Sequence, residues 1–256
     1  MAAQVPALPD SRALRAARPG GGGPAGQDGP ADLSRRTYLA LWDLIATRTL
    51  RPGDKVTAEG LSQRFGVSRT TVKTALDQLA LEGLVLVRPQ VGTFVRGLSA
   101  QDIREIWAAR MLLETGAARE GALRATPAQR AALRSLVAEM GPLIQGHEHR
   151  EGQYRAFVEL DRRFHELLVR TADNRFLLGL HRQAAVHTHA VSFVTLHARR
   201  GLRRADEGLR EHQAIVEAFE RRDPQGAVAV LERHIERSRE VALQALQALP
   251  GPAGVL

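Results

Sequence analysis

The sequence contains no cysteine among its 256 residues. Without thiols it can form neither a disulfide framework nor a thiolate zinc site, so histidine and carboxylate side chains are its only strong metal ligands. Apolar residues make up 44% of the chain, yet no run approaches the roughly 20 consecutive apolar residues that cross a membrane. Met1–Asp10 has no charged segment before an apolar core, so no secretory signal is expected. These absences predict a cytoplasmic protein without a membrane partner.

Lysine is also scarce, because only Lys55 and Lys73 stand among the 36 basic residues. The formal net charge of +8 is uneven: residues 35–97 hold 10 basic and 5 acidic side chains, whereas residues 98–256 hold 23 and 20. A local basic excess is typical of a domain that faces nucleic-acid phosphates. An arginine bias of this kind is also what a GC-rich genome produces, so the charge alone leaves both interpretations open.

The composition predicts three parts along the chain. Residues 1–32 are rich in alanine, proline and glycine, and they bury too little apolar surface to offset the entropy of ordering. We therefore expect a disordered tail there. Residues 33–97 are expected to form a small domain, and residues 98–247 a larger helical domain, with the boundary near Gly97.

The small domain shows the element order of a winged helix-turn-helix. Apolar residues from Tyr38 to Ile45 recur at spacings of 3 and 4, which is typical of an amphipathic helix. Gly66 is placed to end a second helix, and Ser68 is a good N-cap for a third. Two short apolar runs then predict a β-hairpin. The predicted helices span about 35–49, 58–65 and 68–82, and the predicted strands span about 84–87 and 93–95.

In a winged helix-turn-helix the third helix enters the major groove, and its first turns contact base edges. Arg69 can pair bidentately with guanine, which is worth about 1–3 kcal/mol of discrimination. The neighbouring threonines suit phosphate contacts. The alternative is a solvated helix face that contacts nothing. We predict a set of DNA-contacting residues on the helix and the hairpin: Ser68, Arg69, Thr70, Thr71, Lys73, Gln90, Gly92 and Thr93.

From Ser99 onward the pattern contains helices only. Breaks at proline, glycine and an Asp-Asn pair separate six helical stretches with short connections, which predicts an all-α bundle. The expected fold class is mainly α: an N-terminal winged helix-turn-helix of three helices plus a β-hairpin, followed by an all-α helical bundle. The six predicted stretches span about 99–124, 127–145, 151–172, 174–198, 205–221 and 224–247.

Three histidines and one aspartate are placed to meet inside this bundle. Asp161 and His165 are four residues apart, which puts them one turn apart on the same helix face. His212 and His234 each lie 11 residues from Asp223, so antiparallel helices joined there would bring both imidazoles to one height. Such a set suits a divalent metal ion: Zn²⁺ first, with Ni²⁺ and Mn²⁺ as alternatives. If these were separate structural side chains, four polar groups would lie on apolar faces without a common partner.

Several segments of both domains form a recognisable combination. In the small domain they are LRPGDKV (50–56), FGVSRTTVKTAL (65–76), EGLV (82–85) and GTFV (92–95). In the bundle they are Arg110-x3-Glu114, Asp161-x2-Phe164-His165, Glu211-His212-x2-Ile215 and Leu231-x2-His234-Ile235. Over about residues 35–245 the chain resembles GntR-family transcription regulators of the FadR type, whose helical effector domain is called the FCD domain. The six effector helices, rather than seven, resemble the VanR-type branch.

Three positions depart from the family pattern. Many members have proline where this chain has Thr71, arginine where it has Lys73, and glutamate where it has Ala58. Lys73 keeps the positive charge but lacks the planar fork of arginine, so a base contact there becomes a phosphate contact. The operator sequence therefore cannot be copied from a relative.

The resemblance implies a ligand as well as a metal. It places a divalent metal at the same four positions that the spacing brings together. It also implies that Arg110 binds the carboxylate of a small effector, and Arg182 is a second candidate for that task. The alternative for Arg110 is a surface ion pair with Glu114, four residues further along the helix.

The function predicted is that of a ligand-responsive, homodimeric transcription regulator in the cytoplasm, associated with the nucleoid. Two winged helices would bind a near-palindromic double-stranded DNA operator, and the resemblance implies a repressor. One alternative is a constitutive architectural DNA-binding dimer. Another is a metal-dependent enzyme, but the chain lacks a motif such as HExxH, and Glu166 points about 100° away from His165 around the helix. We predict no enzyme activity.

Overall fold

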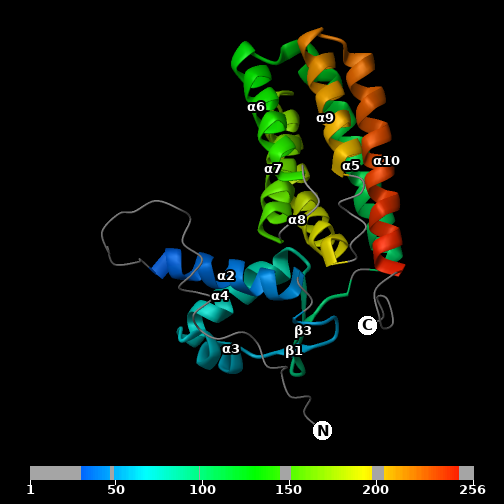
Figure 1. The fold of residues 1–256 in the computed structure, drawn as a ribbon. Helices are drawn as coiled ribbons and strands as arrows, with labels where there is room; N and C mark the ends of the chain where they lie inside the picture. The colour runs from blue at the N-terminus through cyan, green and yellow to red at the C-terminus, as the bar shows by residue number, and fades with distance from the viewer. Residues whose placement is uncertain (1–29, 47–48, 98, 145–150, 198–204, 248–256) are drawn as a thin grey trace. The chain divides into compact units, whose positions relative to one another are not determined.

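The computed structural model describes residues 30–46, 49–97, 99–144, 151–197 and 205–247 (Figure 1). Most of the expected tail, residues 1–32, lies outside the described residues. Its last three residues are helical, because helix α2 spans Pro30–Ala46 and begins earlier than predicted. Proline suits the first turn of a helix, whose N–H groups have no intrahelical partner, and Asp32 adds favourable negative charge there. The expectation of disorder for residues 30–32 is therefore wrong.

The chain divides into two compact units between Leu98 and Ser99. The N-terminal unit contains α2, β1 (Lys55–Val56), α3 (Ala58–Phe65), α4 (Arg69–Leu81), β2 (Val85–Arg88) and β3 (Gly92–Val95). The three strands form an antiparallel sheet in the order β1-β3-β2. The predicted hairpin is present, and β1 adds a strand that was not predicted. Together these elements are a winged helix-turn-helix.

Local capping explains where the central helices of this unit stop and start. Gly66 ends α3 in the left-handed conformation with φ 65°, which glycine adopts without steric cost. The side chain of Ser68 accepts a hydrogen bond from the backbone N–H of Thr71 and caps α4. The buried face of α4, with Val72 and Leu79, packs against α2. The opposite face of α4 is left exposed at its first turn.

The second unit is a bundle of six helices within the described residues. The six are α5 (Ala100–Arg124), α6 (Pro127–Ile144), α7 (Glu151–Arg170), α8 (Arg175–His197), α9 (Ala205–Glu220) and α10 (Pro224–Gln247). Helix α5 packs against α7, α8, α9 and α10, whereas α6 packs against α7 and α9. The fold class predicted from the sequence is confirmed. No helix among the described residues is long and apolar enough to cross a membrane.

Helices α9 and α10 run side by side in opposite directions after a tight turn (Figure 1). Asp223 closes that turn, because its Oδ1 accepts a hydrogen bond of 2.8 Å from the backbone N–H of Gly226. On the facing sides Ile215 of α9 and Leu231 of α10 are completely buried. This packing fixes the register of the two helices, and with it the heights of His212 and His234.

Candidate functional site

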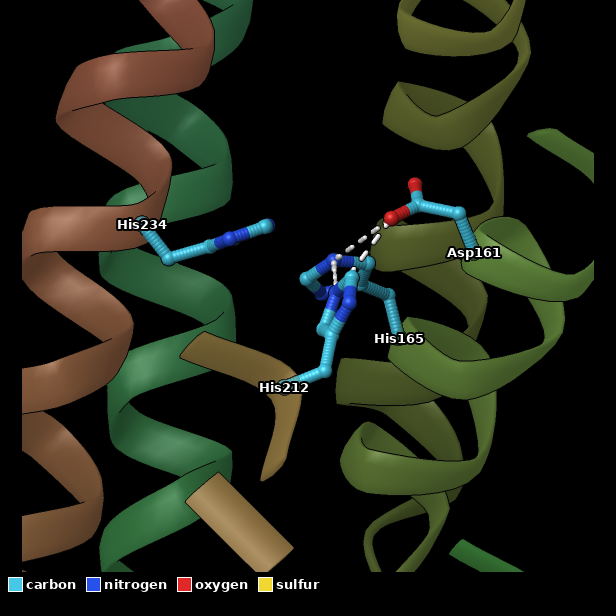
Figure 2. A group of neighbouring side chains, drawn as sticks. All are labelled: Asp161, His165, His212 and His234. Atoms are coloured by element: carbon cyan, nitrogen blue, oxygen red, sulfur yellow. Dashed lines mark hydrogen bonds and ion pairs between the residues drawn. The ribbon is translucent and has the colours of Figure 1, made fainter. Parts of the chain in front are cut away.

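The structure brings together all four residues that the sequence placed at one point. Helix α7 contributes Asp161 and His165, α9 contributes His212, and α10 contributes His234 (Figure 2). One ligand atom from each lies within 4.8 Å of the other three. Nε2 of His212 is 3.4 Å from Nε2 of His165 and 3.3 Å from Oδ1 of Asp161, and Nε2 of His165 is 3.8 Å from that oxygen. These atoms surround a common centre.

The separations are those of a metal ligand set. Ligands about 2.1 Å from a tetrahedral metal ion lie about 3.4 Å from one another. The three imidazoles are 3%, 0% and 7% exposed, so they are nearly withdrawn from water. Burial lowers the pKa of His165 and, together with the positive charge of neighbouring imidazoles, brings the pKa of His212 well below its ordinary value. Both rings are therefore neutral near pH 7, which leaves nitrogen lone pairs free for a metal.

Two carboxylates orient the imidazoles of His165 and His234 from the side opposite the cluster. Nδ1 of His165 lies 2.7 Å from Oε2 of Glu114, and Nδ1 of His234 lies 3.0 Å from Oε2 of Glu211. With the proton on Nδ1 facing the carboxylate, Nε2 presents its lone pair to the cluster. Carboxylate–histidine pairs of this kind commonly fix the tautomer and raise the basicity of metal ligands. Neither glutamate was predicted from the sequence to play this role.

Glu114 is also bound by Arg110, deep inside the bundle. Nε of Arg110 donates to Oε1 of Glu114 over 2.7 Å, and the two residues are only 4% and 0% exposed. The alternative of a surface ion pair is therefore wrong: the pair forms, but it is buried. Burial alone would raise the pKa of Glu114, yet Arg110 and His165 bring that pKa well below its usual range. The ionised carboxylate lies between the arginine and the imidazole: it accepts from Nε of Arg110, and its other oxygen is 2.7 Å from Nδ1 of His165.

A cavity opens beside the cluster between α5, α7 and α8. Its lining is rich in basic and hydroxyl groups and consists of Arg110, Glu114, Val158, Asp161, Arg162, His165, His181, Ala185, Thr188, His189 and Ser192. Arg182, the second effector candidate, is not in this lining, because its exposed side chain is held by Glu166 at 2.5 Å. Arg162 is present instead. Arg162 was not predicted from the sequence, since it follows Asp161 directly and therefore starts on a different helix face.

The predicted DNA-contacting residues of the helix lie at the start of α4. Arg69, Thr70 and Lys73 are exposed there. Ser68 and Thr71 are engaged with each other in the helix cap, since their hydroxyl oxygens are 2.7 Å apart. These two side chains hold the helix start in place, whereas the side chains of Arg69, Thr70 and Lys73 remain accessible to another molecule.

Arg69 forms an ion pair with a residue of the preceding helix, α3. Its Nη2 lies 2.5 Å from Oε1 of Glu59 on α3, although both side chains remain more than half exposed. An exposed ion pair of this kind contributes little to stability. A guanine edge or a phosphate can therefore replace Glu59 as the partner of Arg69 at small cost.

The hairpin tip holds the other three predicted residues. Gln90 has a positive φ of 63°, and Gly92 has φ 137°. The φ of Gly92 lies in a region that residues with a Cβ rarely adopt, which favours glycine at this position. Thr93 pairs with Val56 of β1 and with Val87 of β2, so the sheet fixes its position next to the tip.

Without metal, the protein is expected to lose stability as the pH falls below 6.5. The unfolded chain binds protons on His165 and His212 with ordinary pKa values near 6.5, but burial lowers both pKa values in the folded state. The unfolded state then holds more protons, which lowers the unfolding free energy by up to about 1.4 kcal/mol per pH unit for each group. Urea unfolding of chelator-treated protein at pH 7.5 and pH 5.5 measures this difference.

The variant His212→Leu serves as the control for that experiment. It removes one of the titrating groups, so its unfolding free energy should change less between the two pH values. Glu114 does not interfere, because its folded pKa lies below 4.5 and the carboxylate is ionised at both pH values. Equal unfolding free energies of the unmodified protein at pH 7.5 and pH 5.5 would contradict the prediction.

Comparison with known proteins agrees with both units. The family described as "Bacterial regulatory proteins, gntR family" matches residues 33–95, and the FCD domain family matches residues 105–237, about half of the chain. The chain is 28% identical to the uncharacterised HTH-type transcriptional regulator YdhC of Bacillus subtilis over 202 residues, covering 78% of this chain and 86% of YdhC. It is 27% identical to the HTH-type transcriptional repressor RspR of Escherichia coli over 215 residues, covering 84% of this chain and 91% of RspR.

Solved structures share the fold. McbR/YncC of E. coli matches 83% of this chain and 97% of its own length with a TM-score of 0.68 at 18% sequence identity. Lar of Listeria monocytogenes matches 83% of this chain and 97% of its own length with a TM-score of 0.61 at 17% identity. The similar curated proteins carry the names of transcriptional regulators and not of enzymes. The chain belongs to the GntR family of bacterial regulatory proteins, in the FadR-type branch that carries an FCD domain.

Proposed function

We propose that this protein is a homodimeric transcription repressor whose FCD domain binds one divalent metal ion and a small carboxylic acid. The observation that carries the proposal is the convergence of four ligand atoms within 4.8 Å, with Glu114 and Glu211 next to the Nδ1 atoms of His165 and His234. Its winged helix-turn-helix binds a near-palindromic operator, because two copies related by a two-fold axis present two equivalent reading helices.

The donor set favours zinc. Nε2 of His165, His212 and His234 and one oxygen of Asp161 would hold the ion, and three nitrogens with one oxygen suit Zn²⁺. Ni²⁺ and Mn²⁺ accept the same donors and are the alternatives. The bound ion would supply positive charge that attracts an anionic ligand oxygen. Asp161 belongs both to the cluster and to the cavity lining, so the ion would lie at the cavity wall.

The cavity suits a carboxylate effector. Arg110 and Arg162 bring two guanidinium groups to its lining, and Thr188 and Ser192 bring hydroxyl groups. Arg110 is the first candidate for the carboxylate contact, while Arg182 stays a weaker one because it is not part of the cavity lining. An effector that binds one arrangement of the dimer better than the other shifts the population of DNA-binding states.

The test is the affinity of the metal-loaded protein for DNA from the flanking region of its own gene. Fluorescence anisotropy is followed as small carboxylic acids are added one at a time. We expect at least one acid to weaken binding, and we expect that effect to disappear in the His212→Ala/His234→Ala variant. A constitutive architectural protein would show the same affinity with every acid. Turnover of an acid by the metal-loaded protein would instead support an enzyme.

The carboxylate behind His234 should strengthen the metal site. Replacing Glu211 with glutamine removes the charge that holds the Nδ1 proton, and losses of about 10–100-fold in metal affinity are typical of such changes. Competition with a chromophoric chelator measures the dissociation constant. The control is Glu217→Gln on the same helix, since Glu217 pairs with the exposed Arg221 and touches no histidine of the cluster. Equal affinities for Glu211→Gln and the unmodified protein would count against the assigned role.

A further inference from the structure

The three-stranded sheet of the N-terminal unit has one buried face and one outward face. Val56, Val85 and Val95, one from each strand, are buried on the first of these. Successive side chains of a strand point to opposite faces of a sheet. The alternate positions therefore belong to the outward face, which we call the outer wing face: Lys55, Leu86, Arg88, Gly92 and Phe94.

Phe94 lies at the centre of the outer wing face. It pairs across the sheet with Lys55 of β1 on one side and with Leu86 of β2 on the other. Nζ of Lys55 lies over the Phe94 ring at 6.0 Å from its centroid, and Cζ of Arg88 lies over it at 5.3 Å. Both distances are within the range of cation–π attraction. One aromatic ring therefore gathers two cations from the two outer strands.

Both cations lie beside the tip of the hairpin. Arg88 pairs directly with Gly92 in the sheet. The side chain of Lys55 passes close to Gly92 from the other strand, because a Cβ built on Gly92 would be 2.6 Å from its Cε and 3.3 Å from its Nζ. The turn between Arg88 and Gly92 contains Gln90, which was predicted from the sequence to contact DNA. The two charges are therefore placed at the end of the hairpin that is expected to approach DNA.

Neither cation is neutralised by a carboxylate of the described residues. Lys55 and Arg88 each contact Phe94, whereas the exposed Arg69 of the same unit pairs with Glu59. Residues 84–97, which include the whole hairpin, contain no aspartate and no glutamate. Two like charges held near each other repel, and cation–π attraction at an exposed site is weak. An anion that binds both cations would remove this repulsion.

Duplex DNA is the anionic partner that fits this surface. A single small anion would gain little here, because exposed ion pairs contribute little. A DNA strand instead offers a row of phosphates about 3.4 Å apart along the helix axis, and other residues of the same unit hold the duplex in place. An acidic protein would also meet the cations, but the hairpin carries no negative charge that would select its basic residues.

We propose that Lys55 and Arg88, positioned by Phe94, bind phosphate groups of the DNA strand beside the hairpin tip. These contacts add to the eight DNA-contacting residues predicted from the sequence, and they do not depend on base identity. They anchor the hairpin on any duplex, while helix α4 selects the operator. Phe94 is a positioning residue, because it acts through the two cations. The inference rests on DNA binding and on neither the metal nor the effector.

The first test is the double variant Lys55→Gln/Arg88→Gln. Fluorescence anisotropy with an unrelated duplex, repeated at several salt concentrations, gives the slope of log affinity against log salt. Each lost phosphate contact should reduce this slope by about 0.9, so the double variant should reduce it by about 1.8. Both side chains are exposed, so the fold should be retained, as circular dichroism would verify. An unchanged slope in the double variant would overturn the proposal.

Two control variants separate a phosphate contact from a general change of the surface. Leu86→Gln alters a neighbouring position of the same face, where the leucine is 41% exposed, without changing the charge. Arg134→Gln removes an exposed positive charge from the other unit. Both should keep the slope of the unmodified protein. A slope reduced as much by Arg134→Gln as by one of the two wing substitutions would show that net charge alone sets the affinity, and would overturn the proposal.

The same variants distinguish phosphate contacts from base contacts. Lys55→Gln/Arg88→Gln should weaken binding to the operator and to the unrelated duplex by the same factor, because phosphates carry no sequence information. A loss confined to the operator would mean that the two cations contact bases. A loss confined to a single-stranded oligonucleotide would mean that the face binds single strands. Either result would overturn the assignment to duplex phosphates.

The role of Phe94 is tested with every charge in place. Phe94→Leu keeps an apolar side chain but removes the ring, and the lost cation–π attraction should weaken binding to the unrelated duplex by about 2–5-fold. Phe94→Tyr keeps the ring and should bind as the unmodified protein does. A purely structural role would lower Tm without this difference in affinity. Equal affinities for Phe94→Leu and Phe94→Tyr would overturn the positioning role.

The outcomes separate this inference from the function on which it rests. If the unmodified protein bound no duplex at any salt concentration, both the DNA-binding function and the phosphate contacts would be overturned. If it bound the operator and Lys55→Gln/Arg88→Gln left the salt dependence unchanged, only the phosphate contacts of the outer wing face would be overturned.

Discussion

The His212→Ala/His234→Ala variant is expected to show no thermal stabilisation by Zn²⁺, whereas the unmodified protein should show a large one. At a zinc concentration 1,000 times the dissociation constant, binding to the folded state alone adds about 4.1 kcal/mol. For a domain of this size that free energy raises Tm by about 8–16 °C. Differential scanning fluorimetry with and without Zn²⁺ measures the shift.

The variant should fail because only Asp161 and His165 remain of the ligand set. Two ligands leave a buried site with half of its donors missing, and the ordered geometry of the cluster is lost with them. The control is His187→Ala on α8, whose side chain is not one of the four that converge. This control should keep the full zinc-dependent shift. A shift that persists in the double variant would mean that the ion binds elsewhere.

Replacing Arg69 with alanine is expected to weaken operator binding by about 5–150-fold. Arg69 is the first residue of the recognition helix α4, and its side chain is 68% exposed. Loss of a bidentate arginine–guanine pair costs about 1–3 kcal/mol, which corresponds to this range. Fluorescence anisotropy with the operator and with an unrelated duplex should show a larger loss for the operator, because a base contact carries sequence information.

Lys73→Ala provides the comparison within the same helix. Its loss should weaken binding to both duplexes alike and reduce the slope of log affinity against log salt by about 1, as expected for a phosphate contact. Arg134→Ala on α6, an exposed arginine of the other unit, should leave both affinities unchanged. If Arg69→Ala, like Arg134→Ala, left both affinities unchanged, the exposed face of α4 would be a solvated surface that does not contact DNA bases.

Much of the N-terminal unit could be predicted from the sequence because its signals are local. Gly66 and Ser68 act within one turn of their own position, so the end of α3 and the start of α4 follow from residue type. Strand β1 could not be predicted in this way. It consists of two residues, too few for an alternating pattern, and it exists only because Lys55 and Val56 pair with β3 almost forty residues later.

The convergence of the four candidate metal ligands could also be predicted from the spacing of residues in the sequence. The helical repeat and the turn at Asp223 together set the height of each side chain along its helix. The carboxylates of Glu114 and Glu211, which contact two of these histidines, could not be predicted in this way. Glu211 directly precedes His212 in the sequence, yet it binds His234 on the neighbouring helix. Glu114 reaches His165 across the bundle from α5. Such partners depend on how each helix is rotated about its own axis, which the spacing of residues within one helix does not determine.

Elemental analysis of protein purified without chelator or metal-affinity resin is the most direct measurement. The proposed site predicts about one divalent ion per chain in the unmodified protein and almost none in the His212→Ala/His234→Ala variant. The His187→Ala control should carry as much metal as the unmodified protein. Equal metal content in the unmodified protein and the double variant, or none in either, would contradict a metal site formed by Asp161, His165, His212 and His234.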